Sequence, residues 1–243
     1  MDAPAYRAEK KPANLIGAAI LAIPALFWAF EGKAQTDLIP ESQLRYFAGL
    51  TVASDYVNNG ISMTNGLPTI QPLLELDWRG FYAGTVVSYV RQASNRAEFD
   101  FYLGYRKKLR NGMYFDTGYR RFVLNDTLDC CGEFKLRLLS PLAGDLAGEV
   151  YFGYNPQLDS FNRRGRLLWS VTDDLTASAA YGETSANQNE YWDAGVTYAL
   201  TGKLSVDLRY QGSETGDVGV VVKLSWATVE NSLARILANP LGQ

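Results

Sequence analysis

The chain has 243 residues, of which 47% are hydrophobic, 13% are aromatic and 20% are charged. This composition is too apolar for a disordered chain, and the length suits one large or two small domains. The formal net charge is −3 without a long Lys/Arg run, so we expect no nucleic-acid partner. The chain contains no His, which excludes His-based acid–base chemistry, the usual serine triad and most zinc sites.

The N-terminal region has the pattern of a secretory signal peptide. Three basic residues among the first eleven precede an apolar run from Leu15 to Phe30, and Gly32 and Ala34 then place small residues at −3 and −1 of a cleavage site. This predicts a signal peptide over residues 1–34, cleaved between Ala34 and Gln35. An uncleaved anchor is the alternative, although the apolar run is short for a membrane-spanning helix.

The rest of the chain alternates between apolar and polar residues with a period of two. In residues 204–211, every even position is apolar or aromatic and every odd position is polar. This is the pattern of a β-strand with one apolar and one polar face. Twelve segments show it: 44–53, 69–78, 81–91, 97–106, 112–122, 133–139, 145–154, 163–171, 174–182, 190–200, 203–211 and 217–226.

The connections between these segments alternate in length. Those after even-numbered segments are short: 79–80, 107–111, 140–144, 172–173 and 201–202. Several after odd-numbered segments are longer and more polar: 54–68, 123–132, 155–162 and 183–189. This parity is typical of an outer-membrane barrel with short periplasmic turns and longer outside loops. We therefore predict an all-β fold, a closed antiparallel transmembrane β-barrel over residues 44–226, with about 12 strands and 10 or 14 as alternatives.

A soluble β-sandwich would show the same alternation, but two features favour a lipid-facing exterior. The polar face carries charges of both signs together with many glycines, as expected of a narrow lumen. Aromatic residues gather at strand ends, as in the interfacial girdles of membrane barrels. The predicted girdle residues are Tyr46, Trp78, Phe81, Tyr105, Phe122, Tyr154, Trp169, Tyr181, Trp192, Tyr210 and Trp226.

One segment is not explained by alternation, namely Ser54-Asp55-Tyr56-Val57-Asn58-Asn59-Gly60-Ile61-Ser62. It resembles the proteobacterial Gcw_chp family, whose members are often called TorF-family porins. The resemblance returns at residues 64–71, 80–85, 190–196 (with Tyr191, Trp192 and Asp193) and 220–225, and covers about 44–226. It implies an outer-membrane location and a channel, and it supplies no substrate. Family members usually carry an aromatic–Arg pair before the glycine, where this chain has Asn58-Asn59.

The polar face of the predicted strands supplies the candidate pore-lining residues. They are Arg45, Glu75, Asp77, Glu98, Asp100, Arg106, Asp116, Arg120, Glu133, Lys135, Arg137, Glu149, Arg164, Arg166, Asp193, Asp207, Arg209 and Lys223. In a hydrophilic pore these charges would set ion selectivity. In a plugged barrel the same charges would pair across the interior, because buried charges require partners. The sequence leaves both interpretations open.

A more specific hypothesis is a transverse electric field across the lumen. The basic residues Arg120, Lys135, Arg137, Arg164 and Arg166 fall on the fifth, sixth and eighth segments. The acidic residues Glu75, Asp77, Glu98, Asp100 and Asp116 fall on the second, fourth and fifth. If each group forms one wall, the basic wall attracts anions. Reversing the charges of Arg164 and Arg166 should then shift selectivity toward cations.

Catalysis and cofactor binding have weaker support. The carboxylate pairs Glu75/Asp77 and Glu98/Asp100 each share one strand face, which suits acid–base work, but lumen lining explains the spacing equally well. We therefore expect that the protein is not an enzyme. No phosphate-binding glycine loop or metal-ligand spacing occurs, so we expect no cofactor and no metal.

Two polar regions lie outside the predicted strands. Cys130 and Cys131 are the only cysteines and fall in an expected outside loop. Three interpretations remain open: a vicinal disulfide, an intermolecular bridge, and loop thiols without a role, of which the last is favoured. A metal site formed with neighbouring acidic residues is a weaker alternative. The Asn- and Gly-containing loop 54–68 is interpreted as turn chemistry rather than a ligand site.

The predicted function is an outer-membrane porin-like channel for passive diffusion of ions or small hydrophilic solutes. The alternative is a plugged structural or interaction barrel that presents its loops or tail to partners.

Residues 35–43 are expected to be a short periplasmic segment, and 227–243 a periplasmic tail with a short amphipathic helix or a loosely ordered extension. Expected partners are outer-membrane lipid and the barrel-assembly machinery during biogenesis, and a homo-oligomer remains open.

Overall fold

The computed structural model describes residues 44–126, 131–216 and 219–228. The predicted signal peptide over 1–34, its cleavage site between Ala34 and Gln35, segment 35–43 and the helix of the tail all lie outside these residues. Within the described ranges, no helix is long and apolar enough to cross a membrane.

The residues that the structure describes form fourteen strands. They are β1 (Arg45–Ala53), β2 (Val57–Asn58), β3 (Ile61–Ser62), β4 (Thr69–Trp78), β5 (Phe81–Gln92), β6 (Asn95–Lys108), β7 (Tyr114–Leu124), β8 (Cys131–Ala143), β9 (Leu146–Asn155), β10 (Ser160–Ser170), β11 (Leu175–Thr184), β12 (Asn189–Thr201), β13 (Leu204–Ser213) and β14 (Gly219–Ala227). Strands β2 and β3 form a separate hairpin, and the other twelve match the twelve predicted segments.

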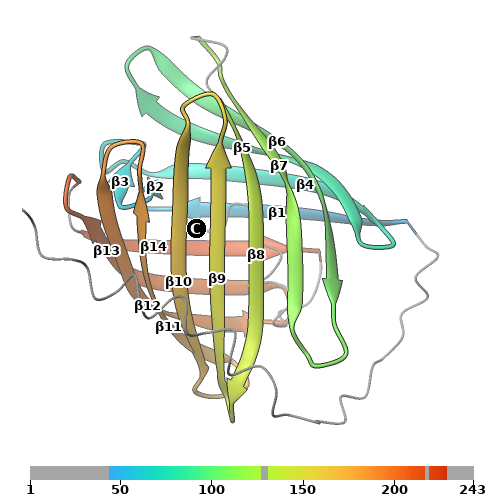
Figure 1. Cartoon of the computed structure of the whole chain (residues 1–243). Coiled ribbons are helices and arrows are strands. Elements are labelled where there is room, and N and C mark those ends of the chain that lie inside the picture. The colour runs from blue at the N-terminus through green and yellow to red at the C-terminus, as the bar shows by residue number, and fades with distance from the viewer. Residues whose placement is uncertain (1–43, 127–130, 217–218, 229–243) are drawn as a thin grey trace, which may run out of the picture. The chain divides into compact units, whose positions relative to one another are not determined.

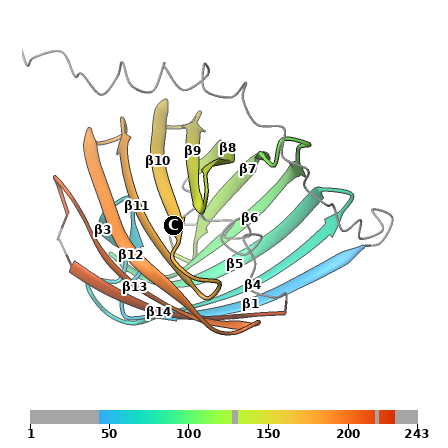
Figure 2. The same cartoon turned by 90° about the horizontal axis from the view of Figure 1, so that it is seen from below.

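These twelve strands close into an antiparallel barrel in which each strand pairs with its neighbour in sequence (Figures 1 and 2). The first strand completes the ring because β1 pairs with β4 on one side and with β14 on the other. Leu50, for example, lies opposite Pro72 of β4 and Trp226 of β14. The predicted fold class and strand number are therefore confirmed.

The two ends of the barrel carry different connections. At one end, which we call the terminal end, lie the start of β1, the end of β14 and the turns 79–80, 109–113, 144–145, 171–174 and 202–203. At the other, the hairpin end, lie the connections 54–68, 93–94, 156–159 and 185–188, together with residues 125–126 and 214–216. The expected contrast in length is weaker than predicted, because β8, β10, β11 and β12 extend into the segments expected as loops. Connection 54–68 stands out, because it contains the β2–β3 hairpin.

The outer surface of the barrel is apolar. Leu103 is 60% exposed and Phe134 is 54% exposed, and at least one large apolar or aromatic side chain is exposed on every described barrel strand except β7. An exposed apolar band of this extent is unfavourable in water and favourable in lipid. Ten of the eleven predicted girdle residues remain candidates for the aromatic girdles on this outer surface. Phe122 is the exception, because on β7 it shares the inward face with Arg120, whose guanidinium carbon lies 4.5 Å from the ring centroid.

Candidate functional site

The barrel interior holds the charged residues that alternation places on its inner face. Eleven of the eighteen predicted interior residues are buried: Glu75, Asp77, Glu98, Asp100, Asp116, Arg120, Lys135, Arg137, Glu149, Arg166 and Arg209. Glu133, Arg106, Arg164, Asp193 and Asp207 have side chains at most 15% exposed. Lys223 is half-buried, and Arg45 lies at the terminal rim with its side chain 46% exposed.

At the terminal end, two acidic side chains of β4 are held by arginines. Arg106 of β6 forms an ion pair with Glu75 and reaches Asp77 with its Nε at 3.1 Å. Arg45 of β1 binds the other oxygen of Asp77 at 2.6 Å. Glu75 and Asp77 are one of the two carboxylate pairs whose spacing suits acid–base work, and both carboxylates form ion pairs with arginine.

Asp116 of β7 is the centre of a second buried group. It accepts hydrogen bonds from the Tyr82 hydroxyl at 2.5 Å and from the Lys135 ammonium at 3.2 Å. Lys135 also lies over the ring of Tyr82, 5.4 Å from its centroid. An acid assigned to one wall of the transverse field is therefore paired directly with a base of the other wall.

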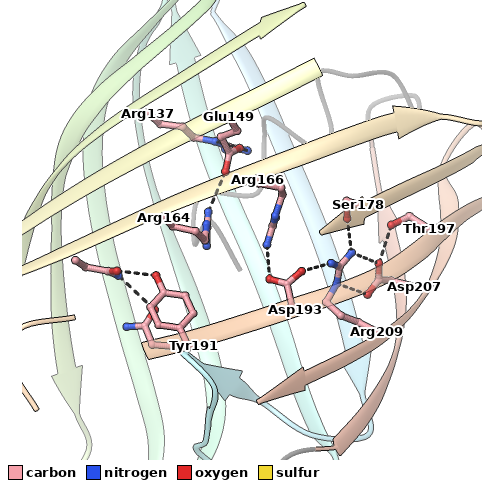
Figure 3. A network of polar contacts seen from close by, with 12 residues as sticks. Arg137, Glu149, Arg164, Arg166, Ser178, Tyr191, Asp193, Thr197, Asp207 and Arg209 are labelled. Carbon is pink, nitrogen blue, oxygen red and sulfur yellow. Dashed lines mark hydrogen bonds and ion pairs between the residues drawn. The ribbon is translucent and has the colours of Figure 1, made fainter. Parts of the chain in front are cut away.

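A larger network crosses the middle of the barrel (Figure 3). Glu149 of β9 accepts from Arg137 Nε at 2.6 Å and from Arg164 Nη2 at 3.0 Å. Asp193 of β12 accepts from Arg166 Nη2 at 3.0 Å and also pairs with Arg209.

Arg209 of β13 extends this network toward β11 and β12. It donates to Asp207 at 2.9 Å and to Ser178 at 3.0 Å, and Asp207 accepts a further bond from Thr197. Removing one partner from a buried pair costs roughly 3–5 kcal/mol, so this network holds β9 to β13 in a fixed arrangement.

The interior charges are unevenly distributed around the ring. Strands β4 to β6 contribute four carboxylates and one arginine: Glu75, Asp77, Glu98, Asp100 and Arg106. Strands β7 to β10 contribute five cations and three carboxylates: Asp116, Arg120, Glu133, Lys135, Arg137, Glu149, Arg164 and Arg166. The expected basic side therefore contains interleaved acids, and the transverse field remains a prediction about the net charge of each side.

The β2–β3 hairpin is the second part of the candidate site. Asn59 and Gly60 have φ angles of 49° and 73° and connect the two strands directly. A two-residue Asn-Gly turn with positive φ at both positions is the favoured connection of a tight β-hairpin. Asp55 fastens the hairpin base by accepting hydrogen bonds from Ser62 at 2.7 Å and Thr64 at 2.5 Å.

The base of the hairpin packs against β5 and β6. Tyr56 is only 2% exposed and donates from its hydroxyl to Glu98 of β6 at 2.9 Å. The backbone N–H of Arg91, on β5, donates to the Met63 carbonyl at 2.7 Å. The hairpin is therefore folded into the barrel mouth and does not extend away from it.

The tip of the hairpin reaches the other side of the mouth. The Asn59 carbonyl accepts from Asn189 Nδ2 of β12 at 2.9 Å, and the Asn59 side chain accepts from Asn162 Nδ2 of β10 at 3.3 Å. The Gly60 carbonyl accepts from the Ser213 hydroxyl of β13 at 3.1 Å. Since β6 and β12 are six strands apart in a ring of twelve, the hairpin spans the mouth from wall to wall.

A cavity of about 330 Å³ remains between the hairpin and the wall formed by β7 to β10. Its lining includes Arg120, Glu133, Tyr151 and Arg164 from that wall, and Asn58 from the hairpin. A volume of this size lies at the lower end of the range for small-molecule sites. The hairpin end therefore offers a narrow, charged space beside the hairpin.

The two segments that suggested the family meet at this hairpin. Tyr191, from residues 190–196, donates to Asn162 at 2.6 Å, and Asn162 in turn binds Asn59. Asp193 of the same segment belongs to the central network. Ser54 hydrogen-bonds to Val222 of β14, which extends the pairing of β1.

The inward folding of this loop was not predicted from the sequence. Its Asn59-Gly60 dipeptide was a recognisable signal for a two-residue hairpin, but it did not indicate where the hairpin would pack. Asn162, Asn189 and Ser213, which bind the tip, carry no sequence pattern that marks them.

Cys131 corrects a further expectation. It begins β8, is 8% exposed and is disulfide-bonded. The favoured interpretation of free loop thiols is therefore wrong for this residue. Cys130 lies outside the described residues.

Among the described residues, no cluster of three His, Cys, Asp or Glu side chains is arranged to hold a metal ion.

Comparison with known proteins agrees with this fold. The family described as "Bacterial protein of unknown function (Gcw_chp)" matches residues 38–234. The chain belongs to the Gcw_chp family. No curated protein matches the chain in sequence.

Similar solved structures are outer-membrane porins of very low identity. The "KdgM porin" has 9% identity and a TM-score of 0.57, covering 74% of this chain and 98% of that chain. A NanC porin structure has 11% identity and a TM-score of 0.52, covering 75% of this chain and 100% of that chain. At such identities the likeness extends to the fold, which this Gcw_chp protein shares with porins.

Proposed function

We propose that this Gcw_chp protein is an outer-membrane channel through which ions or small hydrophilic solutes diffuse passively. The observation that carries the proposal is a closed barrel with an apolar exterior, a charged interior and a cavity beside an inward-folded hairpin. The shared fold of the KdgM and NanC porins supports it. The hairpin end faces outward, because a signal-directed chain with an even strand number leaves its terminal end in the periplasm.

The route that we propose passes between the hairpin and the wall of β7 to β10. Charges there are arranged as ion pairs, so permeating ions exchange water for fixed side chains of both signs. The hairpin narrows the mouth of the barrel. This constriction admits small solutes and excludes larger ones. We propose no catalytic role, because the chain has no His and Glu75 and Asp77 are held by Arg106 and Arg45.

Liposome swelling tests this proposal by solute size. Liposomes that contain the refolded protein should swell in glycerol and arabinose, and more slowly in sucrose. A variant in which residues 57–62 are replaced by a two-glycine link should admit sucrose faster. If liposomes with folded wild-type protein swell no faster than empty liposomes in any of these solutes, the barrel is closed and the plugged alternative replaces the channel.

A further inference from the structure

The acidic groups that line the cavity beside the hairpin have hydrogen-bond donors. Glu98 accepts a bond from the Tyr56 hydroxyl at 2.9 Å. Glu133 accepts bonds from the Tyr151 hydroxyl and, at 3.4 Å, from Arg120. Asp193 is held between two arginines of the central network. The carboxylates that line the cavity therefore already bond to side chains of the protein itself.

The donors are not satisfied to the same degree. Within the part of the chain that the structure describes, no acceptor bonds Nε and Nη1 of Arg120, Nε of Arg166 or Nε2 of Gln211. All three residues line the cavity. The side chains of Arg120 and Arg166 are 8% and 7% exposed, respectively. Buried guanidinium groups without acceptors are costly, and a bound acceptor removes that cost.

The surplus of donors indicates the chemistry of a ligand. Arginine binds carboxylates through its planar set of N–H groups, and such charge-assisted bonds are about twice as strong as neutral ones. The lining also includes apolar side chains, among them Phe122, Leu124 and Leu158. An inorganic anion would leave this apolar surface uncovered, whereas a carbon skeleton covers it.

From this arrangement we propose that the cavity binds a small organic acid, with a carboxylate on the free donors of Arg120 and a second acceptor group on Arg166. The donors come from β7 and β10, so the ligand bridges the wall beside the hairpin. Gln211 of β13 adds a neutral donor from across the cavity. This inference deepens the proposed channel by naming the class of solute that its outer cavity recognises.

Calorimetric titration of the purified, folded protein in detergent tests binding without requiring conduction. Succinate is the probe, and 1,4-butanediol is the matched control, since it has the same carbon chain and no charge. We expect binding heat from succinate and none from butanediol. Equal heats from both, or none from succinate, would overturn the proposal. Equal affinity for inorganic phosphate would overturn the assignment to an organic acid.

Substitutions locate the site. Arg120→Gln and Arg166→Gln should each weaken succinate binding at least tenfold, and Arg120→Lys, which retains the charge, should weaken it less than Arg120→Gln. Arg163→Gln is the control, because Arg163 neighbours Arg164 on β10 but is 57% exposed and pairs with Glu183. Folding is checked by heat-modifiable migration, and Arg166→Gln carries the test if Arg120→Gln does not fold.

The results distinguish the two proposals. Affinities of Arg120→Gln and Arg166→Gln that equal that of Arg163→Gln would contradict the assigned site. Succinate binding that depends on Arg120, in a protein that conducts no ions, would leave the site standing and remove the channel. Conduction without succinate binding would leave the channel standing and remove the site.

Discussion

The hairpin tip provides a substitution whose effect can be worked out from geometry. Gly60 and Gly66 both have φ of +73°, so replacing either by Ala carries the same backbone cost of roughly 1–2 kcal/mol. The two positions differ in their surroundings. A Cβ at Gly60 would lie 2.5 Å from the Gly212 carbonyl oxygen, whereas at Gly66 no described atom lies within 4 Å. Gly60→Ala therefore forces the tip away from β13, and Gly66→Ala does not.

The size of the effect follows from the bonds that hold the tip. Three hydrogen bonds, to Asn189, Asn162 and Ser213, fasten Asn59 and Gly60 to the wall. At about 0.5–1.5 kcal/mol net for each bond, their loss shifts the equilibrium between docked and displaced tip by roughly 1.5–4.5 kcal/mol. Since each 1.4 kcal/mol is tenfold, the displaced state gains at least about tenfold in population.

Single-channel recording compares the two variants. Gly60→Ala should spend more time in a state of higher conductance than wild type, and Gly66→Ala should behave as wild type. Thermal unfolding of both variants should differ little, because the barrel pairing is unchanged. Identical conductance of the two variants, with both folded, would refute the assignment of the hairpin as the constriction.

Three further predictions concern the interior charges and the cysteine. Asp193→Asn should lower the free energy of unfolding by about 3 kcal/mol, because Arg166 and Arg209 lose a buried charged partner. Urea unfolding midpoints measure the effect against the control Asp173→Asn, whose side chain is exposed, and equal midpoints of the two variants would contradict the prediction. Arg164→Glu combined with Arg166→Glu should move the reversal potential toward cation selectivity, since both line the cavity, and an unchanged potential would refute that role. Maleimide should label Cys131 only after reduction and denaturation, and labelling of unreduced, denatured protein would contradict the disulfide.

The strands were predictable because the barrel imposes one rule on every residue. Side chains alternate between lipid and interior, so segments such as 69–78, which became β4, could be located from hydropathy alone. Strand ends were less predictable. The predicted segment 133–139 is shorter than β8, which extends from Cys131 to Ala143. Backbone pairing with the neighbouring strands continues at both ends, where the alternation of apolar and polar residues is no longer regular.

The candidate site was only partly predictable for a related reason. Alternation identifies which charges face inward, but it does not pair Asp116 with Lys135 or Glu149 with Arg137 and Arg164. Those pairings depend on the register between strands. The docking of Asn59 against Asn162 and Asn189 depends on contacts more than one hundred residues apart, which no local pattern encodes.

Single-channel current through the wild-type protein in a planar bilayer, recorded under a salt gradient, tests the central claim most directly. A channel that passes ions beside the hairpin predicts discrete current steps, with a reversal potential that changes when Arg164 and Arg166 are reversed. A folded, heat-modifiable barrel that inserts into the bilayer and gives no current steps would contradict the claim. It would mean that the hairpin and the interior ion pairs close the barrel.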